Sequence, residues 1–165
     1  MAKVGVTLTA LFLIVIGGWF VMNSLLPILD LGDSFSLTVA ASAFYLYIKL
    51  EMTAEMAKLF YYLFPIIGAL SFIAGIALLS KKGRVFSKVM LFVLLAVSVM
   101  ALIFCFALMG CSDPNSFLGM FKDSFESGSL TDLLRPIAEP LLIFFAALFG
   151  TIFMFGKSVK EHFEE

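Results

Sequence analysis

The sequence predicts an all-α membrane protein, a bundle of four transmembrane helices with short interfacial helices in its two outer loops. The chain has 165 residues, of which 62% are hydrophobic and only 14% are charged, whereas soluble domains are about 45–50% apolar and about 25% charged. A core this small cannot hide so much apolar surface, so lipid must be part of the solvent. Four runs with few or no charges are each long enough to cross about 30 Å of hydrocarbon as a helix.

The four runs place spans at about 4–27, 59–80, 89–111 and 138–157 within a single domain, 1–165. The first is interpreted as a retained helix, because its apolar run exceeds the roughly 7–15 residues of a signal-peptide core. The fourth is the shortest, and Glu139 and Lys157 are expected at its opposite interfaces. The outer loops are then about 28–58 and 112–137, and the inner loop is 81–88.

Basic residues in the short loops predict that the N-terminus and the C-terminus are both cytoplasmic, in a plasma or inner membrane. The inner side would carry more of them, namely Lys3, Lys81, Lys82, Arg84, Lys88, Lys157 and Lys160. The outer side would carry Lys49, Lys58, Lys122 and Arg135. The inner loop is the most diagnostic piece, because it holds four basic residues and no acid.

Each outer loop contains an apolar segment too short to cross the membrane. Segment 37–50 is favoured as a helix that is interfacial or re-entrant, although alternating residues around Phe44 and Tyr45 also fit a strand. In the second loop, Asp113-Pro114 signals a helix start and Gly128 an end. Between them, apolar residues recur at helical spacing: Phe117, Leu118, Phe121 and Phe125. This pattern predicts a short amphipathic helix.

The composition excludes several kinds of chemistry. A net charge of −1 gives no field that would gather nucleic acid. His162 is the only histidine, and Cys105 and Cys111 cannot join along one intact helix because they are about 9 Å apart in rise. We therefore expect no catalytic residue, no cofactor and no metal site. Cys105 is interpreted as a packing residue and Cys111 as an interfacial thiol.

Two groups of residues are candidate functional positions. Arg135 and Glu139 are four residues apart and are interpreted as a surface pair at the outer end of the fourth span. No ionisable residue is expected well inside a span, which argues against proton relays and charge-coupled transport. In the second span, Pro65, Ser71 and Gly75 could mark a half-helix break that binds an ion. The small residues Ser71 and Gly75, four positions apart, favour a helix-packing face instead.

Glycines also mark the first span. Gly17-Gly18-Trp19 is interpreted as a surface that faces lipid or another subunit.

The stretch from Phe64 to Arg84, a glycine-containing helix followed by a short basic turn, resembles the second helix of DoxX/DoxD-like four-helix membrane proteins. Leu11-Phe12 and Gly17-Gly18 before Pro27 are compatible with that family's first helix. The resemblance implies a redox or quinone-linked membrane subunit. The acidic residue often found in the family's second helix has no counterpart near Ile66 to Gly68.

Three functions follow from these observations, in order of preference. The first is a non-catalytic accessory, assembly or scaffold subunit of a larger membrane complex. The second is a small homo-oligomeric channel or transporter, with its pore between copies. The third is the DoxX-like redox subunit. Membrane lipids and other membrane subunits, or further copies of the chain, are the expected partners, and no nucleic acid is.

Overall fold

The computed structural model describes residues 2–49, 53–110, 114–156, 159 and 163. These residues form six α-helices and no strand: α1 (Ala2–Ile28), α2 (Leu37–Lys49), α3 (Ala54–Leu79), α4 (Arg84–Leu108), α5 (Pro114–Glu126) and α6 (Leu130–Met154). The predicted all-α fold is confirmed. Segment 37–49 is a helix, so the strand alternative is wrong.

Four helices are long and apolar enough to cross a membrane, namely Lys3–Ile28, Tyr61–Leu79, Arg84–Leu108 and Leu130–Met154. Four apolar helices long enough to span a membrane are therefore present, as predicted. Helix α4 extends beyond the start of the predicted third span, to Arg84. Helix α6 begins at Leu130 and continues without interruption through Pro136 and Pro140 into the fourth span.

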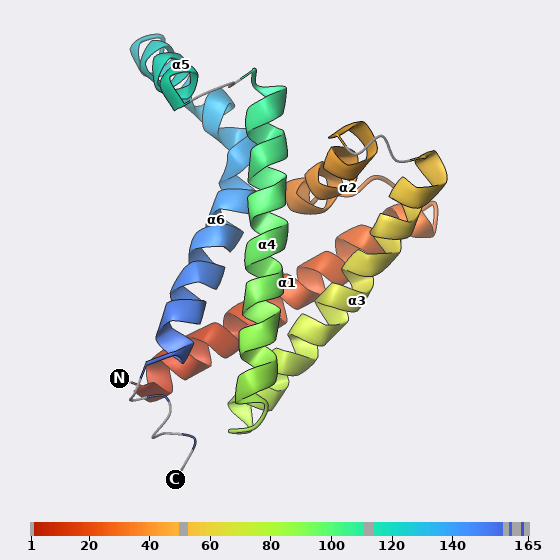
Figure 1. The fold of residues 1–165 in the computed structure, drawn as a ribbon, viewed down its shortest axis with the longest axis vertical. Helices are drawn as coiled ribbons and strands as arrows, with labels where there is room; N and C mark the ends of the chain where they lie inside the picture. The colour runs from red at the N-terminus through yellow and green to blue at the C-terminus, as the bar shows by residue number, and fades with distance from the viewer. Residues whose placement is uncertain (1, 50–52, 111–113, 157–158, 160–162, 164–165) are drawn as a thin grey trace.

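The spans are arranged as two pairs, α1 with α3 and α4 with α6, which cross at a steep angle (Figure 1). The N-terminal end of α1, the α3–α4 turn and the C-terminal end of α6 lie together at the lower end of the bundle in this view. Helix α5 projects from the upper end, beside the start of α6. The bundle therefore has one end with a single tight turn, between α3 and α4, and another end that carries additional structure.

Glycines bring α1 and α3 into close contact. A Cβ atom on Gly17 would lie 2.6 Å from the carbonyl oxygen of Gly68, and one on Gly75 would lie 2.7 Å from that of Ala10. Only glycine allows these backbones to approach so closely. Gly75 is thus on a packing face, as predicted. Gly17 also faces α3, which corrects the prediction of a lipid-facing surface, whereas Gly18 has open space around it.

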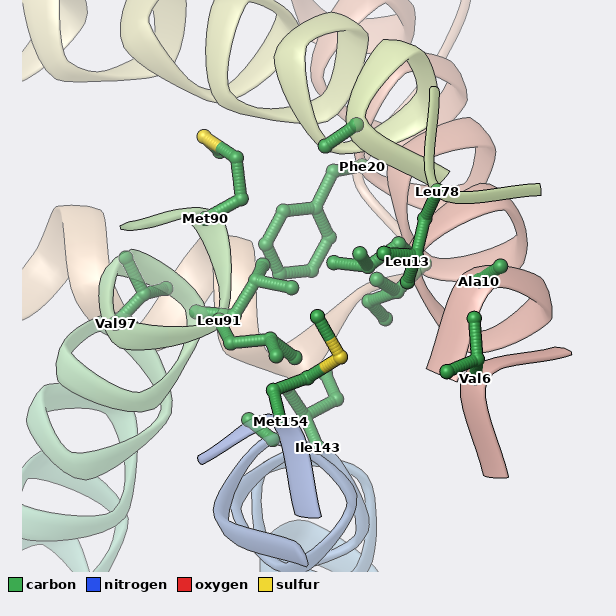
Figure 2. Close-up of a cluster of buried hydrophobic side chains, with 14 of the residues drawn as sticks. Val6, Ala10, Leu13, Phe20, Leu78, Met90, Leu91, Val97, Ile143 and Met154 are labelled. Atoms are coloured by element: carbon green, nitrogen blue, oxygen red, sulfur yellow. The ribbon is translucent and has the colours of Figure 1, made fainter. Parts of the chain in front are cut away.

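The main core lies where all four spans meet (Figure 2). Phe20 from α1, Leu78 from α3, Leu91 from α4, and Ile143 and Met154 from α6 are almost fully buried there. A second, smaller cluster connects α2, α4 and α6; its buried members are Ala41, Ala101, Leu102, Phe104, Cys105 and Ile137. Apolar contact therefore ties α2 to the bundle.

Helix α2 packs among the spans. Its Ser42 hydroxyl donates a hydrogen bond to the carbonyl oxygen of Val97, at 3.4 Å, and Val97 lies in the middle of α4. The buried residues here are Ser36, which precedes the helix, and five residues in its first half, namely Thr38, Val39, Ala41, Ser42 and Ala43. This placement favours the re-entrant alternative over an interfacial helix for this loop.

Helix α5 has few contacts with the rest of the bundle. Phe117 packs edge-on against Phe106 of α4, with ring centroids 5.1 Å apart. Leu118 and Phe125 are exposed. An exposed apolar face beside charged residues is the pattern of an amphipathic helix.

Candidate functional site

Glu139 is the centre of the most extensive polar arrangement in the described residues. It lies nine residues after the start of α6, about 14 Å along the helix. The indole N–H of Trp19 donates to its Oε1 at 3.0 Å, and the Ser36 hydroxyl donates to the same oxygen at 2.6 Å. The backbone N–H of Leu37 donates to Oε2 at 2.7 Å. One carboxylate thus joins α6, α1 and the start of α2.

The carboxylate lies at the N-terminal end of α2, where free backbone N–H groups and the helix dipole favour an anion. Ser36 caps this helix: its hydroxyl accepts from the N–H of Val39 at 3.2 Å, and its carbonyl accepts from that of Ala40 at 3.1 Å. The same hydroxyl therefore accepts from the helix and donates to Glu139.

Asn23 holds the chain that leads into α2. Its side-chain N–H donates to the carbonyl oxygen of Trp19 at 2.9 Å, one helical turn earlier. Its side-chain oxygen accepts from the backbone N–H of Phe35 at 2.7 Å. We call Trp19, Asn23, Ser36, Leu37 and Glu139 the Glu139 cluster.

The cluster is built for anchoring. A carboxylate offers about four lone-pair positions, and protein donors take three of those of Glu139. Hydrogen bonds to a charged group contribute about 1.5–3 kcal/mol each, so the cluster can hold a short helix between spans.

The predicted surface pair of Arg135 and Glu139 is wrong. Among the described residues only Lys122 and Glu126 form an ion pair, at 3.9 Å on the exposed face of α5. Arg135 is exposed, whereas the Glu139 carboxylate binds donors of α1 and α2. Glu139 lies nine residues after the start of α6, within the candidate span Leu130–Met154.

Cys105 has a polar partner in addition to its packing contacts. Pro140 lacks an N–H, so the carbonyl of Pro136 has no partner within α6. The Cys105 thiol donates to that carbonyl oxygen at 3.5 Å. This contact helps α6 to continue through its prolines. The other predicted thiol, Cys111, lies outside the described residues.

The half-helix break considered at Pro65, Ser71 and Gly75 in the second span is not present in α3. Helix α3 continues through Pro65 without a break, and Gly75 is used for contact with α1. Ser71 is fully buried, and its hydroxyl has no hydrogen-bond partner among the described residues. The packing interpretation therefore accounts for Gly75, and nothing in the structure accounts for the Ser71 hydroxyl.

An apolar groove of about 290 Å³ lies between α2, α4 and α6 next to the cluster, with Leu37, Cys105 and Pro136 among its walls. The residues that line this groove present apolar side chains to whatever occupies it. In the part of the chain that the structure describes, no three His, Cys, Asp or Glu side chains are grouped so that they could hold a metal ion.

Sequence reasoning found Glu139 and missed its partners. Ser36 had a usable signal, because a serine directly before an apolar helical run is a typical N-cap. Trp19 and Asn23 are one turn apart on α1, but nothing in the sequence connects them to a carboxylate more than a hundred residues later.

Comparison with known proteins adds no family. No protein-family model, no curated protein and no solved structure matches this chain. The resemblance to DoxX/DoxD-like proteins receives no support from these comparisons. The four apolar helices are compatible with a four-helix, multi-pass membrane protein in general.

Proposed function

We propose that this chain is a non-catalytic accessory or scaffold subunit of a larger membrane complex. The observation that carries the proposal is the Glu139 cluster. Glu139 is set further from a helix end than any other charged residue in the described spans. Charges inside a membrane usually mark chemistry or transport, yet this carboxylate binds three donors of its own chain.

The exterior of the α4–α6 pair supports the same proposal. Phe92, Phe145, Phe149 and Phe155 are exposed there, and the rings of Phe92 and Phe155 contact each other edge-on. Large aromatic side chains are typical of subunit contacts. Lipid contacts are the competing explanation for any single one of them.

Site-specific photo-crosslinking tests the proposal around the whole bundle. A photoreactive residue is placed in turn at exposed positions on α1 (Val15), α3 (Ile73) and α6 (Phe149), and crosslinked in native membranes. An accessory subunit gives a defined protein adduct from one face and lipid adducts from the others. Lipid adducts from all three positions, together with a partner-free monomer after mild detergent extraction, would contradict it.

A homo-oligomeric channel or transporter is the second candidate, and α2 gives it a specific motivation. Half-helices whose N-termini point into a bundle bind anionic substrates in transporters. Here the place of such a substrate is taken by the carboxylate of Glu139. Flux through proteoliposomes separates the two functions: the accessory proposal expects no conductance, and solute flux by the purified protein would favour transport.

The DoxX-like redox function relies on Cys111, Arg135 and Glu139. If it held, Cys111→Ser would abolish a redox activity in membranes, and a quinone or haem spectrum would accompany the purified protein. The accessory proposal expects neither. We further propose that the N- and C-termini face the cytoplasm of a plasma or inner membrane, as the basic α3–α4 turn suggests.

A further inference from the structure

The turn between α3 and α4 contains a strained basic residue. The N–H of Lys82 donates to the carbonyl oxygen of Ala77 at 2.8 Å, and that of Lys81 donates to Leu78 at 3.2 Å. This helix-ending pattern requires a left-handed residue, usually glycine. Lys81 occupies that position with φ of 54°. A lysine there costs stability, which suggests that its charge has a use.

The surroundings of this turn are strongly basic. Lys82, Arg84 and Lys88 follow Lys81 within seven residues, and the sequence has no acid between Glu55 and Asp113. The Lys88 ammonium lies 4.0 Å from the centre of the Phe155 ring at the end of α6. The acidic residues of the C-terminal tail lie outside the described residues.

Two groups at the turn have no anionic partner in the part of the chain that the structure describes. The Nε atom of Arg84 is screened from solvent and has no hydrogen-bond acceptor among the described residues. The first turn of α4 has neither a capping side chain nor an acidic residue. Ser87, the hydroxyl within that turn, donates instead to the carbonyl oxygen of Ala74 at 3.0 Å.

We infer that the α3–α4 turn binds a phosphate group, through Lys81, Lys82 and Arg84. The guanidinium of Arg84 and the ammonium groups of Lys81 and Lys82 are donors that bind phosphate oxygens. The turn connects the ends of two spans, at Leu79 and Arg84, which is where lipid headgroups lie. An anionic phospholipid and a soluble phosphate would supply the same chemistry, so the experiment must separate them.

The lipid arm uses the full chain in detergent micelles that contain either phosphatidylglycerol or phosphatidylcholine. Native mass spectrometry measures how much of each lipid remains bound, and thermal unfolding measures stabilisation. The wild type is expected to retain phosphatidylglycerol several-fold better. Arg84→Gln should lower that preference about five-fold, whereas Lys122→Gln on exposed α5 should leave it unchanged.

Lys81→Gly keeps the experiment informative if Arg84→Gln folds poorly. Glycine adopts the left-handed conformation without strain, so this variant should unfold at a higher temperature in phosphatidylcholine. Its preference for phosphatidylglycerol over phosphatidylcholine should nevertheless fall about five-fold. Opposite changes in the two measurements separate phosphate binding from a purely structural role of the turn.

The soluble arm adds inorganic phosphate to the protein in phosphatidylcholine micelles. Stabilisation there that is lost in Arg84→Gln, without any phosphatidylglycerol preference, supports the phosphate site and assigns it to a soluble ligand. Equal retention of the two lipids together with no effect of phosphate would overturn the inference. So would an unchanged lipid preference in both Arg84→Gln and Lys81→Gly.

Discussion

At the scale of single residues, Glu139 serves as an acceptor that two other helices need. Its loss would leave the N–H of Leu37 and the hydroxyl of Ser36 without their partner, and unpaired donors away from water are costly. Its position within a span is therefore explained by helix α2, whose N-terminal end would otherwise have to find an acceptor in an apolar setting.

Glu139→Gln is the first prediction at this scale. The amide keeps one acceptor oxygen but loses the charge and the bond from Leu37, so we expect a loss of about 2 kcal/mol in the free energy of unfolding. Unfolding in mixed micelles measures this change in the free energy of unfolding. Glu126→Gln, which removes only an exposed pair on α5, is the control and should cost less than about 1 kcal/mol. Equal losses in the two variants would contradict an anchoring role.

A second prediction separates packing from hydrogen bonding at Cys105. Cys105→Val fills similar space but leaves the carbonyl of Pro136 without its donor, so it should cost about 1 kcal/mol. Cys105→Ser keeps a donor and should cost less. Unfolding of the two variants side by side is the measurement. A serine variant less stable than the valine variant would mean that apolar packing alone matters.

At the scale of elements, the α1–α3 pair depends on backbone contact. Gly68→Ala would place a Cβ atom 2.6 Å from the carbonyl oxygen of Gly17, and rigid backbone cannot move aside without separating the helices. We expect a loss of about 1–3 kcal/mol.

The same pair offers a matched control for that measurement. Gly18→Ala on the open side of α1 meets nothing within 4 Å. It should be neutral or gain up to about 1 kcal/mol from helix propensity. Thermal unfolding in detergent compares the stability of Gly68→Ala with that of Gly18→Ala. Similar stabilities would show that the close approach of α1 and α3 is not needed for stability.

The elements also show how far sequence reasoning reaches. The uncharged runs were enough to find four spans, because lipid imposes length and composition on each helix separately. The passage of α6 through Pro136 and Pro140 depends in part on the Cys105 thiol of another helix, a contact that no local pattern reveals.

The site was less predictable than the spans for the same reason. Glu139 and Arg135 are neighbours on one helix, so the local rule for charges four residues apart suggested a pair. The actual partners belong to α1 and α2, and the depth of α2 decides where Glu139 can bind. Position 139 could be singled out as a charge beside an apolar run, but its role required the tertiary arrangement.

At the scale of the whole molecule, the segments that connect or flank the spans lie at two opposite ends of the bundle. The start of α1, the α3–α4 turn and the end of α6 share one end of the bundle, and α5 lies at the other (Figure 1). The basic turn therefore lies at the end of the bundle where α1 begins and α6 ends. Any orientation of the turn in a membrane fixes the orientation of α5 on the opposite side.

Single-cysteine labelling in intact cells tests this orientation. In a background with Cys105→Ser and Cys111→Ser, cysteines are introduced at exposed Ser80 beside the basic turn and at exposed Ser127 after α5. Because basic loops remain cytoplasmic, a membrane-impermeant maleimide should label Ser127→Cys before permeabilisation and Ser80→Cys only afterwards. The reverse pattern would place α5 in the cytoplasm. Labelling of both positions in intact cells would contradict an arrangement in which the four spans separate the two ends.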